Sequence, residues 1–153
     1  MDIKSLANFL KTAKKNTYAS EAAKKVESQR PASRDYEYSE GPFVYHDTYF
    51  GGTSFIGEEI VYENGKPAWG MNYYGCTIDP TITEAEIDKS LRGALKQDYD
   101  DIIPVRGPRV YKIDNFEYRN NVSGDLSKFE GKEEITKDGK LIYSALFHGG
   151  LIK

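Results

Sequence analysis

Two adjacent acids, Glu58 and Glu59, lie in a strand-like segment rich in apolar and aromatic residues. A carboxylate enclosed by aromatic side chains is suited to an organic cation, through cation–π contact and charge pairing. The neighbouring strand-like segments supply aromatic side chains, a further acid and an amide. We therefore predict a binding site for a small cationic or aromatic molecule, with candidate ligand-binding residues Tyr45, Asp47, Tyr49, Glu58, Glu59, Trp69, Met71, Asn72 and Tyr73.

The sequence leaves open which of the two glutamates faces this ligand. Asn64-Gly65 predicts a two-residue hairpin turn, which fixes the register of the strands on either side. Without a bulge, this register places Glu58 on the face of Trp69, Met71 and Tyr73, and Glu59 among small residues. A β-bulge near Gly57 would exchange the two. An ionised carboxylate on an apolar face needs a partner, a raised pKa or a cationic ligand.

Other kinds of site have little support in the sequence. Cys76 and the two histidines, His46 and His148, show no spacing typical of a thiol–imidazole pair or a metal site, and no GxSxG motif is present. Gly51-Gly52 and Gly149-Gly150 follow strands but open no helix, so they predict no phosphate cradle. We expect no metal and no cofactor.

Three functions remain open, and the binding module is the one we favour. The first alternative is a small enzyme that uses Glu58 or Glu59 as a general acid or base, although we expect no enzyme. The second is an interaction or dimerisation domain whose tyrosine-rich sheet face docks a partner or a second copy. Trp69, Met71 and Tyr73 are equally compatible with a core beneath a helix.

Length and composition indicate one folded domain over residues 1–153. The chain has 39% hydrophobic residues and a formal net charge of −3, which argues against direct nucleic-acid binding. A single cysteine fits a reducing compartment. The sequence shows no apolar signal segment and no run of 18 apolar residues, so we expect a cytoplasmic protein without a membrane span.

The chain repeats itself at a spacing of 74 residues. FIGEEIVYENGKPAWGMNYYG (55–75) aligns without a gap to FEGKEEITKDGKLIYSALFHG (129–149), and each is preceded by a segment with helical periodicity, KSLANFLK (4–11) and KSLRGALK (89–96). Thr83 and Glu86 predict a capping box for the second helix. We therefore predict an α+β fold, in which two helix-plus-antiparallel-meander units, about 1–76 and 77–153, form one sheet with the helices packed on one face.

The run YHDTYFGGTSFIGEEIVYENGKPAWGMNYYG (45–75) resembles an uncharacterised bacterial family, a domain of unknown function. The family pattern GEExVxxxGKPxWxMNYYG corresponds here to Gly57 through Gly75, and the likeness extends over most of the chain. Some members resemble the C-terminal part of regulators that carry an XRE-type helix-turn-helix. The resemblance thus implies a ligand sensor, but it brings no activity and no assigned site residues.

Overall fold

The structure is a computed structural model, which describes residues 2–17 and 25–153. The described residues form two helices and nine strands. In chain order these are α1 (Ile3–Asn16), β1 (Lys25–Val26), β2 (Arg34–Glu40), β3 (Phe43–Gly51), β4 (Ser54–Glu63), β5 (Lys66–Thr77), α2 (Glu84–Leu95), β6 (Val110–Ile113), β7 (Phe116–Asp125), β8 (Lys128–Lys137) and β9 (Lys140–Leu151).

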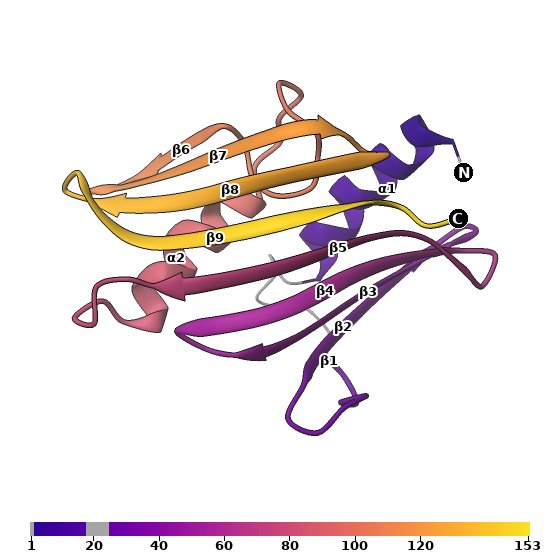
Figure 1. Cartoon of the computed structure of the whole chain (residues 1–153), viewed down its shortest axis with the longest axis horizontal. Coiled ribbons are helices and arrows are strands. Elements are labelled where there is room, and N and C mark those ends of the chain that lie inside the picture. The colour runs from indigo at the N-terminus through magenta and orange to yellow at the C-terminus, as the bar shows by residue number, and fades with distance from the viewer. Residues whose placement is uncertain (1, 18–24) are drawn as a thin grey trace.

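All nine strands form one antiparallel sheet with the order β1-β2-β3-β4-β5-β9-β8-β7-β6 (Figure 1). Each half of the chain builds a meander, and the last strands of the two meanders, β5 and β9, pair in the middle of the sheet. The prediction of an α+β chain built on an antiparallel sheet is confirmed. No helix in the described part of the chain is long and apolar enough to cross a bilayer.

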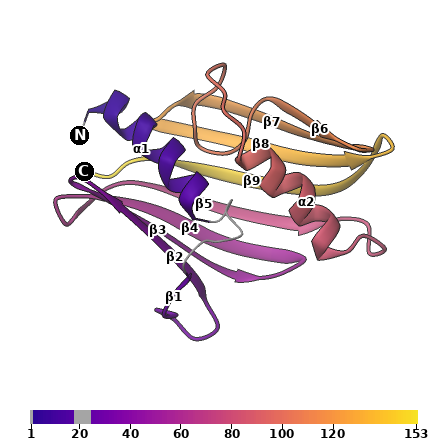
Figure 2. The same ribbon diagram turned by 180° about the vertical axis from the view of Figure 1, so that it is seen from behind.

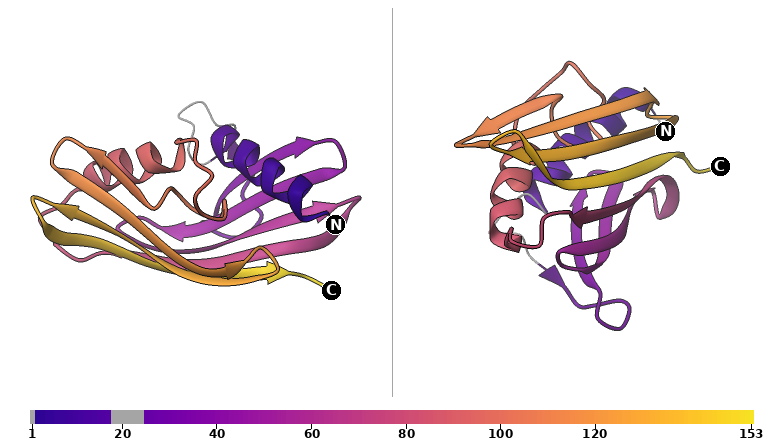
Figure 3. Two further views of the ribbon diagram at one scale, coloured as in Figure 1. Left: turned by 90° about the horizontal axis from the view of Figure 1, so that it is seen from above. Right: turned by 60° about the vertical axis from the view of Figure 1, so that its left-hand side comes forward.

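The sheet curves around the two helices, which lie on its concave side (Figures 2 and 3). Helix α1 contacts β2 and β3, and α2 contacts β6, β7 and β8. Asp2 caps α1 by accepting a hydrogen bond from the Ser5 amide at 2.8 Å. The capping box of Thr83 and Glu86 begins α2 as predicted. Two apolar clusters fill the space between helices and sheet, one centred on α1 and one on α2.

Both hairpin turns have the predicted left-handed backbone. Asn64 and Gly65 have φ of 51° and 78°, and Asp138 and Gly139 have φ of 51° and 79°, as a type I′ turn requires. The first two residue pairs after the β4–β5 turn also follow the predicted register. Ala68 then has no partner in β4, because a bulge makes Val61 pair with Trp69.

This bulge makes the predicted register wrong by one residue beyond the turn. A shift of one residue moves every side chain to the other face of its strand relative to the partner. Glu59, not Glu58, therefore shares the concave face with Trp69, Met71 and Tyr73, and it pairs with Met71. The bulge lies near the turn, not near Gly57.

The two halves have the same local features at corresponding positions. The β8–β9 hairpin has its own bulge, between Ile135 and Thr136. Gly51 and Gly124 both have strongly positive φ, 97° and 91°, and a Cβ on either would lie 2.1 Å from a backbone oxygen. The halves also differ, since β1 has no counterpart in the second half.

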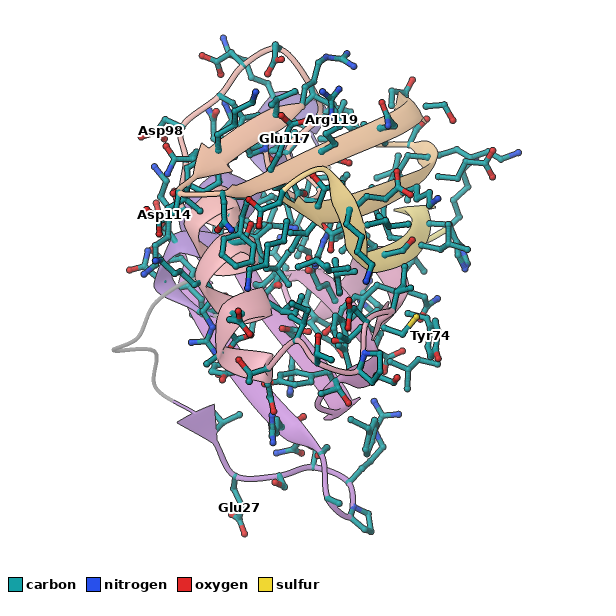
Figure 4. The ribbon with its side chains drawn as sticks, turned by 90° about the vertical axis from the view of Figure 1, so that its left-hand side faces the viewer. Glu27, Tyr74, Asp98, Asp114, Glu117 and Arg119 are labelled. Atoms are coloured by element: carbon teal, nitrogen blue, oxygen red, sulfur yellow. The ribbon has the colours of Figure 1, made fainter. Side chains whose placement is uncertain are left out.

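The convex side of the sheet carries a row of apolar side chains. Phe50, Ile56, Tyr74 and Leu146 pair in sequence across β3, β4, β5 and β9. Ile56, Tyr74 and Leu146 are 57%, 51% and 61% exposed. Figure 4 shows Tyr74 pointing away from the helices. This row therefore lies on the opposite side of the sheet from the helices and the core.

Candidate functional site

Two carboxylates lie opposite each other on the concave face. Side chains alternate between the two faces along β3 and β4, and Asp47 and Glu59 both belong to the concave face. The strand register pairs them directly. Both side chains are buried. Directly opposed residues have Cβ atoms about 4.5–5.5 Å apart, so their like charges repel at short range in a poorly solvated environment.

A tyrosine from the next strand supplies a hydrogen bond to this acid pair. Tyr73 pairs with Gly57 on β4, which in turn pairs with Tyr49 on β3. A Cβ on Gly57 would lie 2.4 Å from the Tyr73 hydroxyl, so only glycine allows the Tyr73 ring to cross β4. The ring therefore reaches β3, where its hydroxyl donates to Asp47 Oδ1 at 2.7 Å.

Two cations reach the acids from outside the first meander. Lys14 extends from α1 and places Nζ 3.1 Å from Glu59 Oε2, while it also donates to the Val105 carbonyl. Arg106 extends from the segment between α2 and β6 and lies 3.8 Å from Glu59 Oε1. Glu59 is therefore paired with cations. Asp47 has no ion pair within 4 Å among the residues that the structure describes.

The main partner of Arg106 is Glu133 on β8. Its guanidinium donates from Nη2 to Oε1 at 2.5 Å and from Nε to Oε2 at 3.1 Å. Tyr118 and Tyr143 donate their hydroxyls to the same carboxylate at 2.8 and 3.0 Å. Glu133 is thus fully satisfied in the core, as buried carboxylates need to be.

These contacts set the protonation of the buried groups. Burial, reinforced by the negative charge of Glu59, raises the pKa of Asp47 to about 7. Burial also lowers the pKa of Lys14, although Glu59 opposes this. Burial alone would raise the pKa of Glu133, but the charge and hydrogen bonds of Arg106 hold it below its usual range. Asp47 is therefore protonated in part near neutral pH.

A count of charges gives the same result. The buried cluster on the concave face contains three carboxyls, Asp47, Glu59 and Glu133, but two cations, Lys14 and Arg106, among the described residues. One carboxyl is in surplus. Because an unpaired buried charge is costly, the surplus must be neutralised by a proton or by a bound cation.

The second half of the chain lacks this surplus. Asn120 pairs with Glu133 across β7 and β8 at the position that corresponds to Asp47 and Glu59. Phe147, which corresponds to Tyr73, packs its ring over Gly131 as Tyr73 does over Gly57. The first half thus has Asp47 with the Tyr73 hydroxyl as its donor. The second half has the amide of Asn120 and a phenylalanine, Phe147, at the same two positions. The uncompensated acid is a specific feature of the first half.

A cavity of about 50 Å³ opens beside the acid pair. Asp47, Glu59 and three tyrosines form its sheet side, and α2 forms the opposite side, shown in front of the sheet in Figure 2. An acid with a pKa near 7 can bind a cation or exchange a proton at neutral pH. The described residues contain no group of three or more His, Cys, Asp or Glu side chains placed to hold a metal ion.

The structure gathers part of the predicted site and separates the rest. Five of the nine predicted residues line the cavity: Tyr45, Asp47, Tyr49, Glu59 and Tyr73. Glu58 and Asn72 pair with each other on the convex face, where Glu58 binds Arg30 at 2.7 Å. Trp69 and Met71 are buried in the α1 cluster, and Trp69 donates to the Leu126 carbonyl at 3.1 Å.

Sequence reasoning missed Lys14, Arg106 and Glu133. Lys14 follows Leu10 by four residues on the buried side of α1, so a lysine on the apolar stripe was a readable signal. Glu133 aligns with Glu59 in the repeat, which could have marked it as buried. Arg106 lies in an irregular segment, residues 97–109, and no periodicity there predicts which side chain turns inward.

Comparison with known proteins identifies the family of the chain. The family model described as a domain of unknown function (DUF5680) matches residues 47–152. No curated protein and no solved structure shows a match to this chain. The matched region begins at Asp47, within β3, and runs through β9, so it contains Glu59, Arg106 and Glu133 as well. The chain therefore belongs to the family of the domain of unknown function DUF5680.

Proposed function

We propose that this protein is a binding module for a small organic cation, held in the cavity between the first meander and α2. The observation that carries the proposal is Asp47: a buried carboxyl opposite a second carboxyl, without a cationic partner among the described residues. A ligand ammonium would neutralise it. The hydroxyl of Tyr73 and the rings of Tyr45 and Tyr49 surround this position, and aromatic faces attract cations.

The internal comparison of the two halves supports this reading. If Asp47 served the core alone, an amide such as that of Asn120 would fill the same position without a surplus charge. We propose that an ancestral helix-and-meander unit was duplicated, that the second unit lost its acid, and that the first kept it for a ligand. The matching bulges and the matching glycines, Gly51 and Gly124, support the duplication.

The test is a thermal-shift measurement with propylamine, 1-propanol and propionate on the protein and on Asp47→Asn. We expect propylamine alone to raise the melting temperature. A ligand at 100 times its Kd stabilises by about 2.7 kcal/mol, which is a shift of about 5–10 °C for a domain of this size. Asp47→Asn should lose the shift, and Glu58→Gln, which changes a carboxylate on the convex face, should keep it. An equal response to 1-propanol would refute a cation site.

The convex row of Phe50, Ile56, Tyr74 and Leu146 favours a second function, which is self-association. A twofold axis along this row would place each apolar side chain against its own copy, as in an isologous interface. Light scattering after size exclusion would then give twice the chain mass, and Tyr74→Ser with Leu146→Ser would give the mass of one chain. A wild-type protein that elutes at the mass of one chain at high concentration would exclude this function.

A further inference from the structure

We infer that the ligand of this cavity is a slender, unbranched primary monoamine. Its ammonium group lies between Asp47 and Glu59, and its methylene chain runs along α2 toward the mouth of the cavity. This inference rests on the proposed function and adds to it the chemical class, the size and the orientation of the ligand.

The inner end of the cavity favours a primary ammonium over a fully substituted one. Glu59 Oε2 is buried and accepts no hydrogen bond from any described residue, although Lys14 Nζ lies 3.1 Å away. Asp47 already accepts a hydrogen bond from Tyr73, but it has no ion-pair partner among the described residues. A primary ammonium carries three N–H donors and can serve both carboxylates. A quaternary ammonium supplies the charge alone and leaves the Glu59 oxygen without a donor, which is costly in a buried site.

The size of the cavity limits the chain. Its volume is about 50 Å³, and one water molecule needs about 10–15 Å³ on the same measure. The cavity therefore has room for about four non-hydrogen atoms in a row. An ammonium group with about three methylenes fits, whereas a branched or polycyclic cation does not.

The wall opposite the sheet favours methylenes along this path. Ile87, Leu91 and Leu95 recur every four residues on α2 and face the cavity, and Phe55 of β4 lines it as well. These side chains are apolar, while the acids stand at the inner end. The ligand should therefore enter with its charge first and bury its chain against α2, because apolar surface gains most from leaving water there.

The mouth of the cavity offers no second site for a cation. Two ion pairs stand there: Arg34 Nη1 lies 3.8 Å from Glu84 Oε1, and Arg92 Nη2 lies 3.2 Å from Asp88 Oδ2. All four side chains line the cavity, and together they are balanced in charge. A second ammonium there would meet two acids that arginines already neutralise, so it would gain no unpaired charge, and a monoamine is the better ligand.

The experiment is titration calorimetry at pH 8 with methylamine, ethylamine, propylamine, butylamine, hexylamine, 1,4-diaminobutane and propyltrimethylammonium. We expect affinity to rise about fourfold per methylene up to about three carbons and then to stop rising. The diamine and the quaternary ammonium should bind at least tenfold more weakly than propylamine. A constant affinity along the series, or equal binding of the quaternary ammonium, would overturn the inference.

Variants of the α2 wall test the position of the chain. Leu91→Ala should extend the rise to longer amines, because it lengthens the apolar part of the cavity. Ile87→Val is a milder change with the same expected direction. Leu10→Ala is the matched control, since Leu10 is a fully buried leucine of the α1 cluster that does not line the cavity. An unchanged length limit in Leu91→Ala and Ile87→Val would contradict the proposed path.

The outcomes separate this inference from the proposed function. If amines bind and Asp47→Asn abolishes binding, but chain length and substitution have no effect, then the cation site stands and the inference fails. If no amine binds, or if Asp47→Asn binds amines as well as the wild type, the proposed function fails with it.

Discussion

Asp47 and Glu59 form a directly opposed pair on β3 and β4, facing the helices. Like charges in this arrangement destabilise a sheet, and Lys14 and Arg106 compensate Glu59 rather than Asp47. The corresponding pair in the second half, Asn120 and Glu133, contains a single acid that Arg106 neutralises. The first half therefore holds one more buried acid than its cations pair with, and the consequences can be measured.

The first prediction concerns stability and pH. The pKa of Asp47 rises from 3.8 to about 7 on folding, so between these values the folded state holds a proton that the unfolded state has lost. The contribution of Asp47 to the free energy of unfolding is therefore complete below about pH 4. It is lost as pH rises to about 7, by roughly 4 kcal/mol at 1.36 kcal/mol per pKa unit. Asp47→Asn removes this loss.

Urea denaturation of both proteins from pH 4.5 to 8 measures the effect. The stability of Asp47→Asn relative to the wild type should increase up to about pH 7 and stay constant above it. The difference reports Asp47 together with its effect on the groups that face it, Glu59, Lys14, Arg106, Tyr45 and Tyr73, because these charges interact. Parallel curves for the two proteins would show that Asp47 titrates normally.

Ligand binding should show the opposite dependence on pH. An ammonium binds best to ionised Asp47, so the affinity for propylamine should fall as pH decreases below 7. The fall should approach tenfold per pH unit. Calorimetry at pH 6.5 in two buffers of different ionisation enthalpy should detect a released proton. Identical heats in the two buffers would show that no proton leaves on binding.

Glu59 and Glu58 should affect Asp47 differently, although they are adjacent in sequence. Glu59→Gln removes the opposed negative charge and leaves the positive charges of Arg106 and Lys14, so the pKa of Asp47 should fall below about 7. Glu58→Gln is the matched control on the convex face and should leave it unchanged. Carboxyl carbon NMR titration of Asp47 in the three proteins gives the answer. A fall in both variants, or in neither, would contradict the register described above.

The Arg106–Glu133 pair should be essential for folding stability. Glu133→Gln leaves Arg106 buried without its bidentate partner, and breaking such a pair costs about 3–5 kcal/mol. Glu134→Gln is the control, because Glu134 pairs with Lys132 at 2.6 Å on the other face of β8 and is partly exposed. We expect it to cost less than about 1 kcal/mol. Equal losses of unfolding free energy in denaturant would exclude a special role for the buried pair.

Two glycine substitutions separate the cost of an unfavourable φ from the cost of steric contact at the site. Gly65→Ala has free space around the new methyl group but a φ of 78°, so it should cost about 1–2 kcal/mol without changing amine binding. Gly57→Ala has an ordinary φ, but its Cβ would lie 2.5 Å from Tyr73 Cζ and 2.6 Å from the Thr48 carbonyl oxygen. It should therefore separate Tyr73 from Asp47 and weaken propylamine binding. Calorimetry at a temperature where both variants are folded distinguishes these effects.

The sequence by itself determined the elements of this protein. Helical periodicity, the Thr83–Glu86 capping box and the Asn64-Gly65 and Asp138-Gly139 turns are local signals, and local hydrogen bonds and backbone preferences produce them. It also indicated that an acid on an apolar strand face would need a partner. These features depend on residues within a few positions of one another.

Only the tertiary structure decided which acid that is and what surrounds it. Ala68 has no partner in β4, and this bulge places Glu59 on the concave face and Glu58 on the convex face. A bulge has no reliable signal in the residue types near a turn. The pairing of Asp47 with Glu59, and the arrival of Lys14 and Arg106 from distant parts of the chain, depend on packing across the whole sheet. The pKa of Asp47 is raised because burial and an opposing charge act together, and neither exists before the chain has folded.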